Sequence, residues 1–487
     1  MSLLCALLPA AGEEQEPAPR AAQQAAWAPE SGKPLRSPQQ LRSRDGVLRV
    51  DLDARRETIG VSGSPLEAQP FNGKLVGPTL RVRPGDRLEV TIRNGTSERT
   101  NIHYHGLHVK PTGISDNVFR VFEPASTAQS VVQLPRDHSP GTYWYHVHLH
   151  GLTDEQVMGG MSGLLIVEGL QELLPRRLRG IRERQLAVRD AQHAGAAIVM
   201  DDAAIAPNEP TTRLVNGLLL PELDLRSGET QLWRIANIGA DLFYDVELTG
   251  HRMHVIAEDG SPVWRVRGRR HLLLPPGKRY DVLVQGGRPG RHAFRTREYD
   301  EGFQLLPTTR LADVTVRGPA SRRRAAIPRR LPTPAKPITD RPVRRKREFT
   351  FTFDFTGGFK ALINGKQFDP HETSVTPRLG SVEQWTLRNP SNEDHPFHIH
   401  VNDFQVMSVN GKPYRANGLQ DVVVIPKNGG EVVIRNPFDD FTGHYVFHCH
   451  ILGHEDAGMM KTVEVLRKGQ RPTPPPAGHA MLHPTAG

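Results

Sequence analysis

The sequence contains only two cysteines, Cys5 and Cys449, among its 487 residues. If Cys449 binds a metal, no second cysteine remains for a disulfide within the chain, and stability must come from burial of a core. Cysteine usage therefore does not indicate a cellular compartment. Long apolar runs are also missing, because no stretch approaches the roughly 20 apolar residues of a membrane-spanning helix. We expect no membrane span.

Methionine and aromatic residues are scarce too, with nine methionines and 6% aromatic residues. The net charge is +9, but basic residues do not alternate with aromatic ones as they would in many nucleic-acid binders. Many of the basic residues gather in a proline-rich stretch between residues 318 and 347, which has the composition of a linker. We therefore expect no nucleic-acid partner.

The two ends of the chain are poor in structure-forming patterns. The first eleven residues are apolar but lack a basic segment, so they are either the remnant of a signal peptide or part of a disordered tail. Residues up to 43 are rich in Ala, Pro, Gln and Glu, a composition typical of disorder. The sequence predicts disordered tails at residues 1–43 and 469–487.

Between the tails, short β-rich runs alternate with Gly, Pro, Asn and Asp, which predicts an all-β protein built from sandwiches. The strongest helical pattern covers residues 171–190, where we expect a helix that connects two domains. A segment with a turn, a strand and a closing Asn occurs three times, at residues 83–94, 226–237 and 378–389. This repeat predicts three similar β-domains. The expected domains cover residues 44–170, 171–317 and 348–468.

Histidine pairs recur at matching offsets in the first and third repeats. His103 and His105 follow Gly85 by 18 and 20 residues, and His398 and His400 follow Gly380 at the same distances. The equivalent positions of the middle repeat hold apolar residues, Val246 and Leu248. The middle domain is therefore predicted to lack this metal chemistry.

A second marker near the end of each domain repeats the pattern. His146 and His148 follow one glycine by five and seven residues, and His448 and His450 follow another in the same way. The middle copy has Arg295 and Arg297 instead. The first and third domains thus carry two His-x-His pairs each.

The residue between the last two histidines distinguishes the third domain. Side chains alternate on a strand, so His448 and His450 point to one face and Cys449 points to the other. The matching residues are Val147 in the first domain and Thr296 in the second. A single strand can therefore serve two metal sites that are joined through the backbone of Cys449.

The donor set favours copper over other metals. Within each pair the histidines lie about 6.6 Å apart along a strand, which suits two neighbouring ions. Eight such imidazoles suffice for a three-copper cluster between two domains. His395, Cys449, His454 and Met459 form the mixed soft set of a blue copper site, although Met459 could equally belong to the core. Zinc is the main rival, but it does not require a cysteine shared between two histidines.

The remaining twelve histidines are interpreted as ordinary polar residues. They are His108, His138, His150, His193, His251, His254, His271, His292, His371, His444, His479 and His483.

Four segments resemble the copper motifs of the multicopper oxidases, a family that includes laccases and bacterial copper efflux oxidases. They are residues 103–106, 144–148, 395–400 and 448–459, and the resemblance extends over all three domains. It implies three cupredoxin-like domains, each a Greek-key β-sandwich, and four copper ions per chain.

Carried over by motif position, the resemblance implies a ligand set for each copper. The type 1 copper would be bound by His395, Cys449, His454 and Met459. The type 2 copper would be bound by His103 and His398, and the type 3 pair by two sets of three histidines: His105, His146 and His450, and His148, His400 and His448.

The resemblance also implies an activity. Electrons from a donor would pass singly through Cys449 to a cluster that reduces O2 to water. Glu455 and Asp116 resemble the carboxylates that supply protons near such a cluster, while the alternative for each is a solvated or turn carboxylate. Like the copper ligands, both are expectations that follow from motif position.

The electron donor stays open between two enzyme readings. A laccase-like enzyme would oxidise phenols or aromatic amines, whereas a metallo-oxidase would oxidise Cu(I). Asp421 and Asp456 fall where efflux oxidases place acids near their substrate copper, but the methionine-rich insert is missing, and soft Cu(I) prefers thioethers. A copper-storage protein is a third reading, which the His-Cys-His link argues against. From the family we expect a periplasmic or extracellular monomer.

Overall fold

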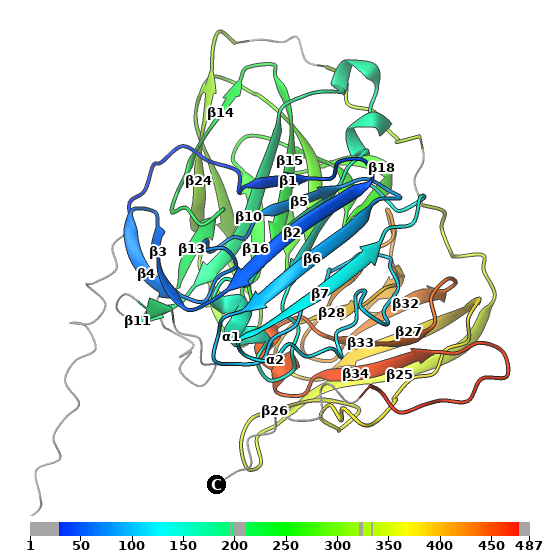
Figure 1. Ribbon diagram of the computed structural model, residues 1–487. Coiled ribbons are helices and arrows are strands. Elements are labelled where there is room, and N and C mark those ends of the chain that lie inside the picture. The colour runs from blue at the N-terminus through cyan, green and yellow to red at the C-terminus, as the bar shows by residue number, and fades with distance from the viewer. Residues whose placement is uncertain (1–28, 195–196, 199–210, 321–324, 333–334, 477–487) are drawn as a thin grey trace, which may run out of the picture.

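A computed structural model of the chain describes residues 29–194, 197–198, 211–320, 325–332 and 335–476. It is almost entirely β, with the domains following one another from the blue to the red end of the chain (Figure 1). Among the described residues, no helix combines the length and apolar character needed to cross a membrane.

The first domain contains sheets of order β2-β6-β7 and β1-β5-β9-β8, and its β3–β4 hairpin extends a further small sheet. A short helix, α1 (Thr153–Met158), follows the second histidine pair. The strands are β1 (Gln40–Arg42), β2 (Val47–Ala54), β3 (Glu57–Val61), β4 (Ser64–Ala68), β5 (Thr79–Val82), β6 (Arg87–Asn94), β7 (Ser126–Gln133), β8 (Gly141–His146) and β9 (Ser162–Val167).

The middle domain contains sheets of order β13-β10-β15-β20-β17-β18 and β14-β24-β21-β16-β19. Its strands are β10 (Glu183–Ala191), β11 (His193–Ala194), β12 (Ala197–Ile198), β13 (Thr212–Val215), β14 (Glu222–Arg226), β15 (Thr230–Asn237), β16 (Tyr244–Leu248), β17 (Met253–Glu258), β18 (Ser261–Arg269), β19 (His271–Leu274), β20 (Arg279–Gln285), β21 (Gly290–Arg297), β22 (Tyr299–Asp300), β23 (Leu305–Leu306) and β24 (Thr309–Arg317).

The third domain contains sheets of order β26-β25-β27-β32-β29-β30 and β31-β28-β33-β34. A short helix, α2 (Leu452–Asp456), follows its last histidine pair. The strands are β25 (Val343–Asp354), β26 (Lys360–Ile363), β27 (Ser381–Asn389), β28 (His395–Ile399), β29 (Gln405–Val409), β30 (Lys412–Pro413), β31 (Val422–Ile425), β32 (Gly430–Phe438), β33 (Gly443–Cys449) and β34 (Met460–Val465).

The threefold repeat of the sequence becomes three equivalent strands, β6, β15 and β27, each ending in a buried asparagine. The amides of Asn94, Asn237 and Asn389 each donate to a backbone carbonyl four or five residues later, at 2.7 to 2.8 Å. Their side-chain oxygens each accept the N–H two residues later. The closing Asn is thus retained because it satisfies the buried backbone of the turn after the strand.

The helix expected over residues 171–190 is wrong. That segment contains two short 3₁₀ turns, η3 (Leu170–Leu173) and η4 (Arg176–Leu178), and then β10. Pro175 separates the two turns, and Gly180 follows with a φ of +70°. Proline lacks the N–H that a helix needs, and a left-handed residue ends a helical run. These two residues prevent a continuous helix.

The tail and linker limits also differ from expectation. Gln40–Arg42 forms β1 and pairs in parallel with β5, so the ordered chain begins before residue 44. β25 begins at Val343, within the stretch expected to be linker. Residues 1–28 and 477–487 of the expected tails lie outside the described residues.

The third domain meets the first through the segments that carry the histidines. Nε2 of His148 in the first domain lies 3.1 Å from Nε2 of both His400 and His448 in the third domain. The helices α1 and α2, which follow the two C-terminal histidine pairs, lie side by side where the domains meet (Figure 1). The two sets of His-x-His pairs therefore face one another across a single interface.

Candidate metal centres

Eight histidines from the first and third domains converge on one buried site. Their side chains are at most 1% exposed. They form three groups in which one nitrogen per residue lies within 4.8 Å of the others: His103, His105 and His398; His105, His146 and His450; and His148, His400 and His448. The structure thus brings together every histidine of the four predicted pairs.

The outer nitrogens of several rings bind backbone carbonyls. Nδ1 of His146 lies 2.6 Å from the backbone oxygen of Val147. Nδ1 of His398 lies 2.8 Å from that of Asp421, and Nδ1 of His448 lies 2.9 Å from that of Cys449. A carbonyl only accepts, so Nδ1 must carry the proton in each ring. This leaves the Nε2 lone pair free to bind a metal, as in most histidine-metal sites.

The inner nitrogens fit a metal cluster. Within the described chain, Nε2 of His103, His146 and His398 is buried with no hydrogen-bond partner. Burial, followed by the repulsion of neighbouring imidazoles, lowers the pKa of His146 and His398 well below its ordinary value, so both rings are neutral. Buried lone pairs without partners are costly, and several cations at the centre of the cluster would satisfy them.

A second group lies on the opposite face of β33. Sγ of Cys449 is 3.6 Å from Nδ1 of His395 and 3.8 Å from Nδ1 of His454. One ion bound about 2.0–2.3 Å from each donor would span these separations. Burial raises the pKa of the Cys449 thiol, so a bound cation is what would release its proton. This donor set fits copper.

Met459 is buried beside this group. Its carbonyl accepts the N–H of Cys449 at 3.0 Å, and its own N–H donates to the carbonyl of His454 at 2.9 Å. Cys449 also lies between His448 and His450 in the chain, and both of these belong to the histidine cluster. The cysteine site and the histidine cluster are therefore joined through the backbone that runs from Cys449 to its two chain neighbours, His448 and His450.

Two predicted carboxylates contact the outer nitrogens of the cluster. Oδ1 of Asp116 lies 3.0 Å from Nδ1 of His103. The carboxylate of Glu455 is fully buried, with Oε1 3.3 Å from Nδ1 of His148 and Oε2 2.9 Å from Nδ1 of His448. Both acids are therefore interior groups rather than solvated turn residues.

Sequence reasoning missed an acidic pair next to the cysteine site. Oε2 of Glu393 lies 3.5 Å from Nε2 of His454, and Glu301 from the middle domain hydrogen-bonds Glu393. Burial and the proximity of the two carboxyls raise the pKa of Glu393. The sequence contains only a weak signal for this pair, because Glu393 stands two residues before His395 but its partner, Glu301, lies in another domain.

Three phenylalanines near His454 were also missed. The ring centres of Phe353 and Phe359 lie 4.9 and 5.8 Å from that of His454. Phe355 packs against both rings and is 71% exposed. An exposed aromatic surface therefore lies beside His454, which at 8% is the most exposed of the candidate ligand histidines.

The placement of Asp421 and Asp456 near a substrate ion is wrong. Asp421 is buried and forms a bidentate pair with Arg279 on the histidine-cluster side of the molecule. The carboxylate of Asp456 accepts the N–H groups of Gly151 and Asp154 in the first domain. Both were misplaced because sequence position does not show which end of a strand or loop faces the substrate.

Histidines expected to have no metal role make ordinary polar contacts where described. Nδ1 of His108 lies 2.7 Å from the carbonyl of Val401 and Nε2 lies 2.8 Å from Asp440, while His138 accepts the N–H of His108. The groups of potential metal ligands found among the described residues include none of the twelve. His479 and His483 lie outside the described residues.

Comparison with known protein families identifies the chain. Three family models described as multicopper oxidase match residues 54–172, 183–311 and 340–469. The chain belongs to the multicopper oxidase family. The three matches follow one another along the sequence and together span most of it.

Relatives of this multicopper oxidase cover most of its length. It is 28% identical over 406 residues to the multicopper oxidase mco of Staphylococcus haemolyticus, which covers 81% of this chain and 83% of the relative. It is 26% identical to a laccase of Bacillus stratosphericus, over 90% of this chain and 98% of the laccase. A structure described as a metallo-oxidase from Campylobacter jejuni matches with a TM-score of 0.78 and 25% identity, over 90% of this chain and 96% of that one.

These matches and the donor groups support a copper-dependent oxidoreductase with cupredoxin-like β-sandwich domains. The family implies copper as the cofactor, and the buried histidine and cysteine groups fit that metal.

Proposed function

We propose that this multicopper oxidase is laccase-like and oxidises phenolic or aromatic amine donors at the site of Cys449. The aromatic surface beside His454 carries this proposal. Phe353 and Phe359 lie against the imidazole and Phe355 extends the surface into solvent, so a planar donor can stack within reach of a ligand ring.

Four copper ions are proposed, with ligands assigned as the motifs imply. His395, Cys449, His454 and the axial Met459 would bind type 1 copper, and His103 and His398 would bind type 2 copper. The type 3 ions would be bound by His105, His146 and His450, and by His148, His400 and His448. The groups of converging donors support the two type 3 sets and the set of His395, Cys449 and His454, while His105 also lies near His103 and His398.

When bound, copper supplies one-electron transfer from the donor and the four-electron reduction of O2 to water. The protein's part is to hold donor and acceptor sites apart yet connected. His454 presents its edge to the donor surface, and Cys449 connects its own site through the backbone to His448 and His450. Burial of the whole path excludes water from it.

Reduction of O2 to water also consumes protons. Glu455 contacts the outer nitrogens of His148 and His448, and Asp116 contacts that of His103. We propose that these two carboxyls pass protons toward the histidine cluster, because each is positioned at its edge and buried.

Oxygen uptake tests the proposal. Protein loaded with copper is given a methoxyphenol or stabilised Cu(I) at matched concentration, with a Cys449→Ser variant as the control. Faster uptake with the phenol, lost in the variant, supports the laccase-like function. Uptake with neither donor in fully loaded protein contradicts an oxidase acting on these donors and favours copper storage.

The acidic pair favours a second candidate, oxidation of metal ions. Glu393 lies against Nε2 of His454 and is hydrogen-bonded to Glu301, so the two carboxyls could hold a cation there. The metallo-oxidase from C. jejuni has a similar fold. Under this function, Cu(I) or another reduced metal ion would be the preferred donor in the uptake experiment. For both candidates we infer a monomer in the periplasm or outside the cell.

A further inference from the structure

The middle domain supplies none of the candidate ligand groups found among the described residues, yet one of its turns reaches the histidine cluster. Gly277, between β19 and β20, has a φ of +81°, and a Cβ placed there would lie 2.8 Å from a ring carbon of His450 and 3.0 Å from one of His105. Both the backbone conformation and the contact require glycine. The turn therefore forms one wall of the cluster.

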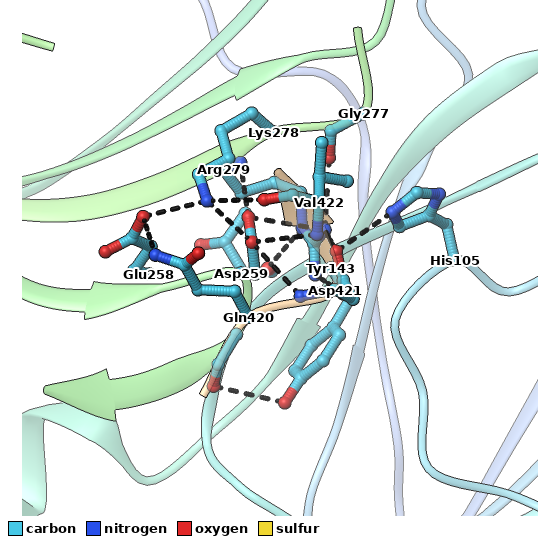
Figure 2. Close-up of polar contacts among 12 residues, drawn as sticks. His105, Tyr143, Glu258, Asp259, Gly277, Lys278, Arg279, Gln420, Asp421 and Val422 are labelled. Atoms are coloured by element: carbon cyan, nitrogen blue, oxygen red, sulfur yellow. Dashed lines mark hydrogen bonds and ion pairs between the residues drawn. The ribbon is translucent and has the colours of Figure 1, made fainter. Parts of the chain in front are cut away.

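Two residues later, the Arg279 guanidinium contacts groups from all three domains, and Figure 2 labels it with its partners Asp421 and Gly277. Nη1 and Nη2 donate to the carboxylate of Asp421 in the third domain at 2.6 and 2.7 Å. Nε donates to the carbonyl of Thr142 on β8 of the first domain at 3.2 Å. Nη1 also donates to the carbonyl of Gly277 at 3.0 Å. The side chain is fully buried, so no water competes for these bonds.

Asp421 in turn contacts one cluster histidine from each flanking domain. Its Oδ1 lies 3.3 Å from Nε2 of His105, and its backbone carbonyl accepts from Nδ1 of His398 at 2.8 Å. The rings of these two histidines stack with centres 3.8 Å apart. The position of Asp421 therefore determines how both rings are held.

A neighbouring lysine fixes the same segment from a second direction. Nζ of Lys278 donates to Asp259 at 2.8 Å and to the carbonyl of Val422 at 2.9 Å (Figure 2). Asp259 also accepts the backbone N–H of Asp421 at 3.2 Å. Side chains of the middle domain thus hold both the backbone and the carboxylate of Asp421.

We propose that Arg279 is a positioning residue for the histidine cluster: through Asp421 it aligns His105 and His398, so that the ligand-free middle domain sets the geometry of the copper cluster. The inference rests on the proposed copper function of the cluster. It assigns a role to residues that are neither ligands nor carriers of protons or electrons.

The fork geometry of arginine is central to this role. Lysine would keep the positive charge but could not make two parallel bonds to the carboxylate while also reaching the Thr142 carbonyl. Residues that orient metal ligands typically alter metal affinity by about 10- to 100-fold when they are changed. Arg279→Lys should therefore weaken copper at the cluster and leave the Cys449 site intact, because that site lies on the other face of β33.

The test compares Arg279→Lys with Arg234→Lys in the full-length protein. Arg234 is an equally buried arginine of the middle domain whose ion pairs go to Glu183 and Asp281 instead. Copper per chain is measured after dialysis against a graded chelator, together with the blue thiolate absorption and the type 2 electron paramagnetic resonance signal. Thermal unfolding of the copper-free proteins shows whether each variant folds.

Selective loss of cluster copper in Arg279→Lys, with the blue absorption retained and Arg234→Lys unchanged, supports the proposal. Equal copper retention in both variants overturns it. If Arg279→Lys does not fold, Asp421→Asn replaces it and the same two outcomes apply, since the amide removes the carboxylate that pairs with Arg279 and contacts Nε2 of His105. A wild-type protein that binds no cluster copper contradicts the proposed function itself, which separates the two failures.

Discussion

Oε2 of Glu393 lies 3.5 Å from Nε2 of His454, and the ring centre of Phe359 lies 5.8 Å from the centre of the same imidazole. The imidazole of His454 is thus next to both an acidic group and an aromatic surface. A cation would be held by the first and a planar phenol by the second, so the two candidate donors can be separated by mutation.

We predict that Glu393→Gln lowers kcat/KM for a reduced metal ion about tenfold, which corresponds to about 1.4 kcal/mol of lost attraction. Because the pKa of Glu393 is raised, a bound cation would displace the proton of its carboxyl, whereas the amide keeps the size of the side chain and cannot become negative. kcat/KM for a methoxyphenol should change less than about twofold, because the phenol would bind at the phenylalanine surface. Steady-state oxygen uptake with both donors checks this. A parallel loss for both donors would contradict separate binding surfaces.

We predict the reverse pattern for Phe359→Ala. Loss of one aromatic contact should reduce kcat/KM for the methoxyphenol about 2- to 10-fold, since such contacts contribute about 0.5–1.5 kcal/mol. Activity with a reduced metal ion should persist. Phe303 is a matched control because it is also exposed but belongs to the middle domain, between β22 and β23. An identical effect of Phe303→Ala would show that general surface hydrophobicity, and not this position, matters.

Cys449→Ser should remove the blue absorption and reduce donor-driven oxygen uptake to background. Serine lacks the soft sulfur donor, while the eight histidines on the opposite face of β33 are unchanged. Copper analysis should still find the cluster loaded. Retention of the blue absorption in the variant would rule out Cys449 as the ligand that produces it.

Glu455→Gln should lower kcat about 10²- to 10⁴-fold, the usual range for loss of a proton-transferring group. Reduction of the blue site by donor without oxygen should proceed as before, because Glu455 contacts the cluster side only. Stopped-flow absorption measures that step. Glu464→Gln is the control, since Glu464 is similarly buried but hydrogen-bonds Thr473. Unchanged kcat in Glu455→Gln would exclude the proposed role.

Acid should destabilise the protein through Glu183. Burial alone would raise its pKa, but the charges of Arg234 and Arg81 and their hydrogen bonds lower it to about 2. The folded pKa lies below the ordinary value, so this stabilisation is present above about pH 4.5 and is lost as the pH falls toward 2. Its size is about 3 kcal/mol.

Glu183→Gln should therefore lower the free energy of unfolding at pH 7 and flatten its fall between about pH 4.5 and 2. Urea unfolding at several pH values measures both effects. A variant whose acid sensitivity equals that of the wild type would show that other carboxyls dominate.

Several features of the site could be predicted because they depend on local periodicity. The alternation of side chains along β33 separates Cys449 from His448 and His450, and it is a property of any strand. The repeated offsets from glycine to histidine brought the four pairs to one interface, because homologous strands occupy equivalent places in homologous domains. The helix expected over residues 171–190 is absent for a local reason as well, since Pro175 and the left-handed Gly180 interrupt the segment.

The sequence by itself determined the fold class, the family and the residues that converge as metal donors. Only the tertiary structure decided which groups surround them. Glu301 reaches Glu393, and Arg279 reaches Asp421, across domain boundaries and more than 90 residues of chain. Such contacts depend on how the sandwiches pack together, and no periodicity within a strand encodes that. The sequence therefore specifies which donor groups are present, whereas the packing of the three domains decides how these donors are aligned and what surrounds His454.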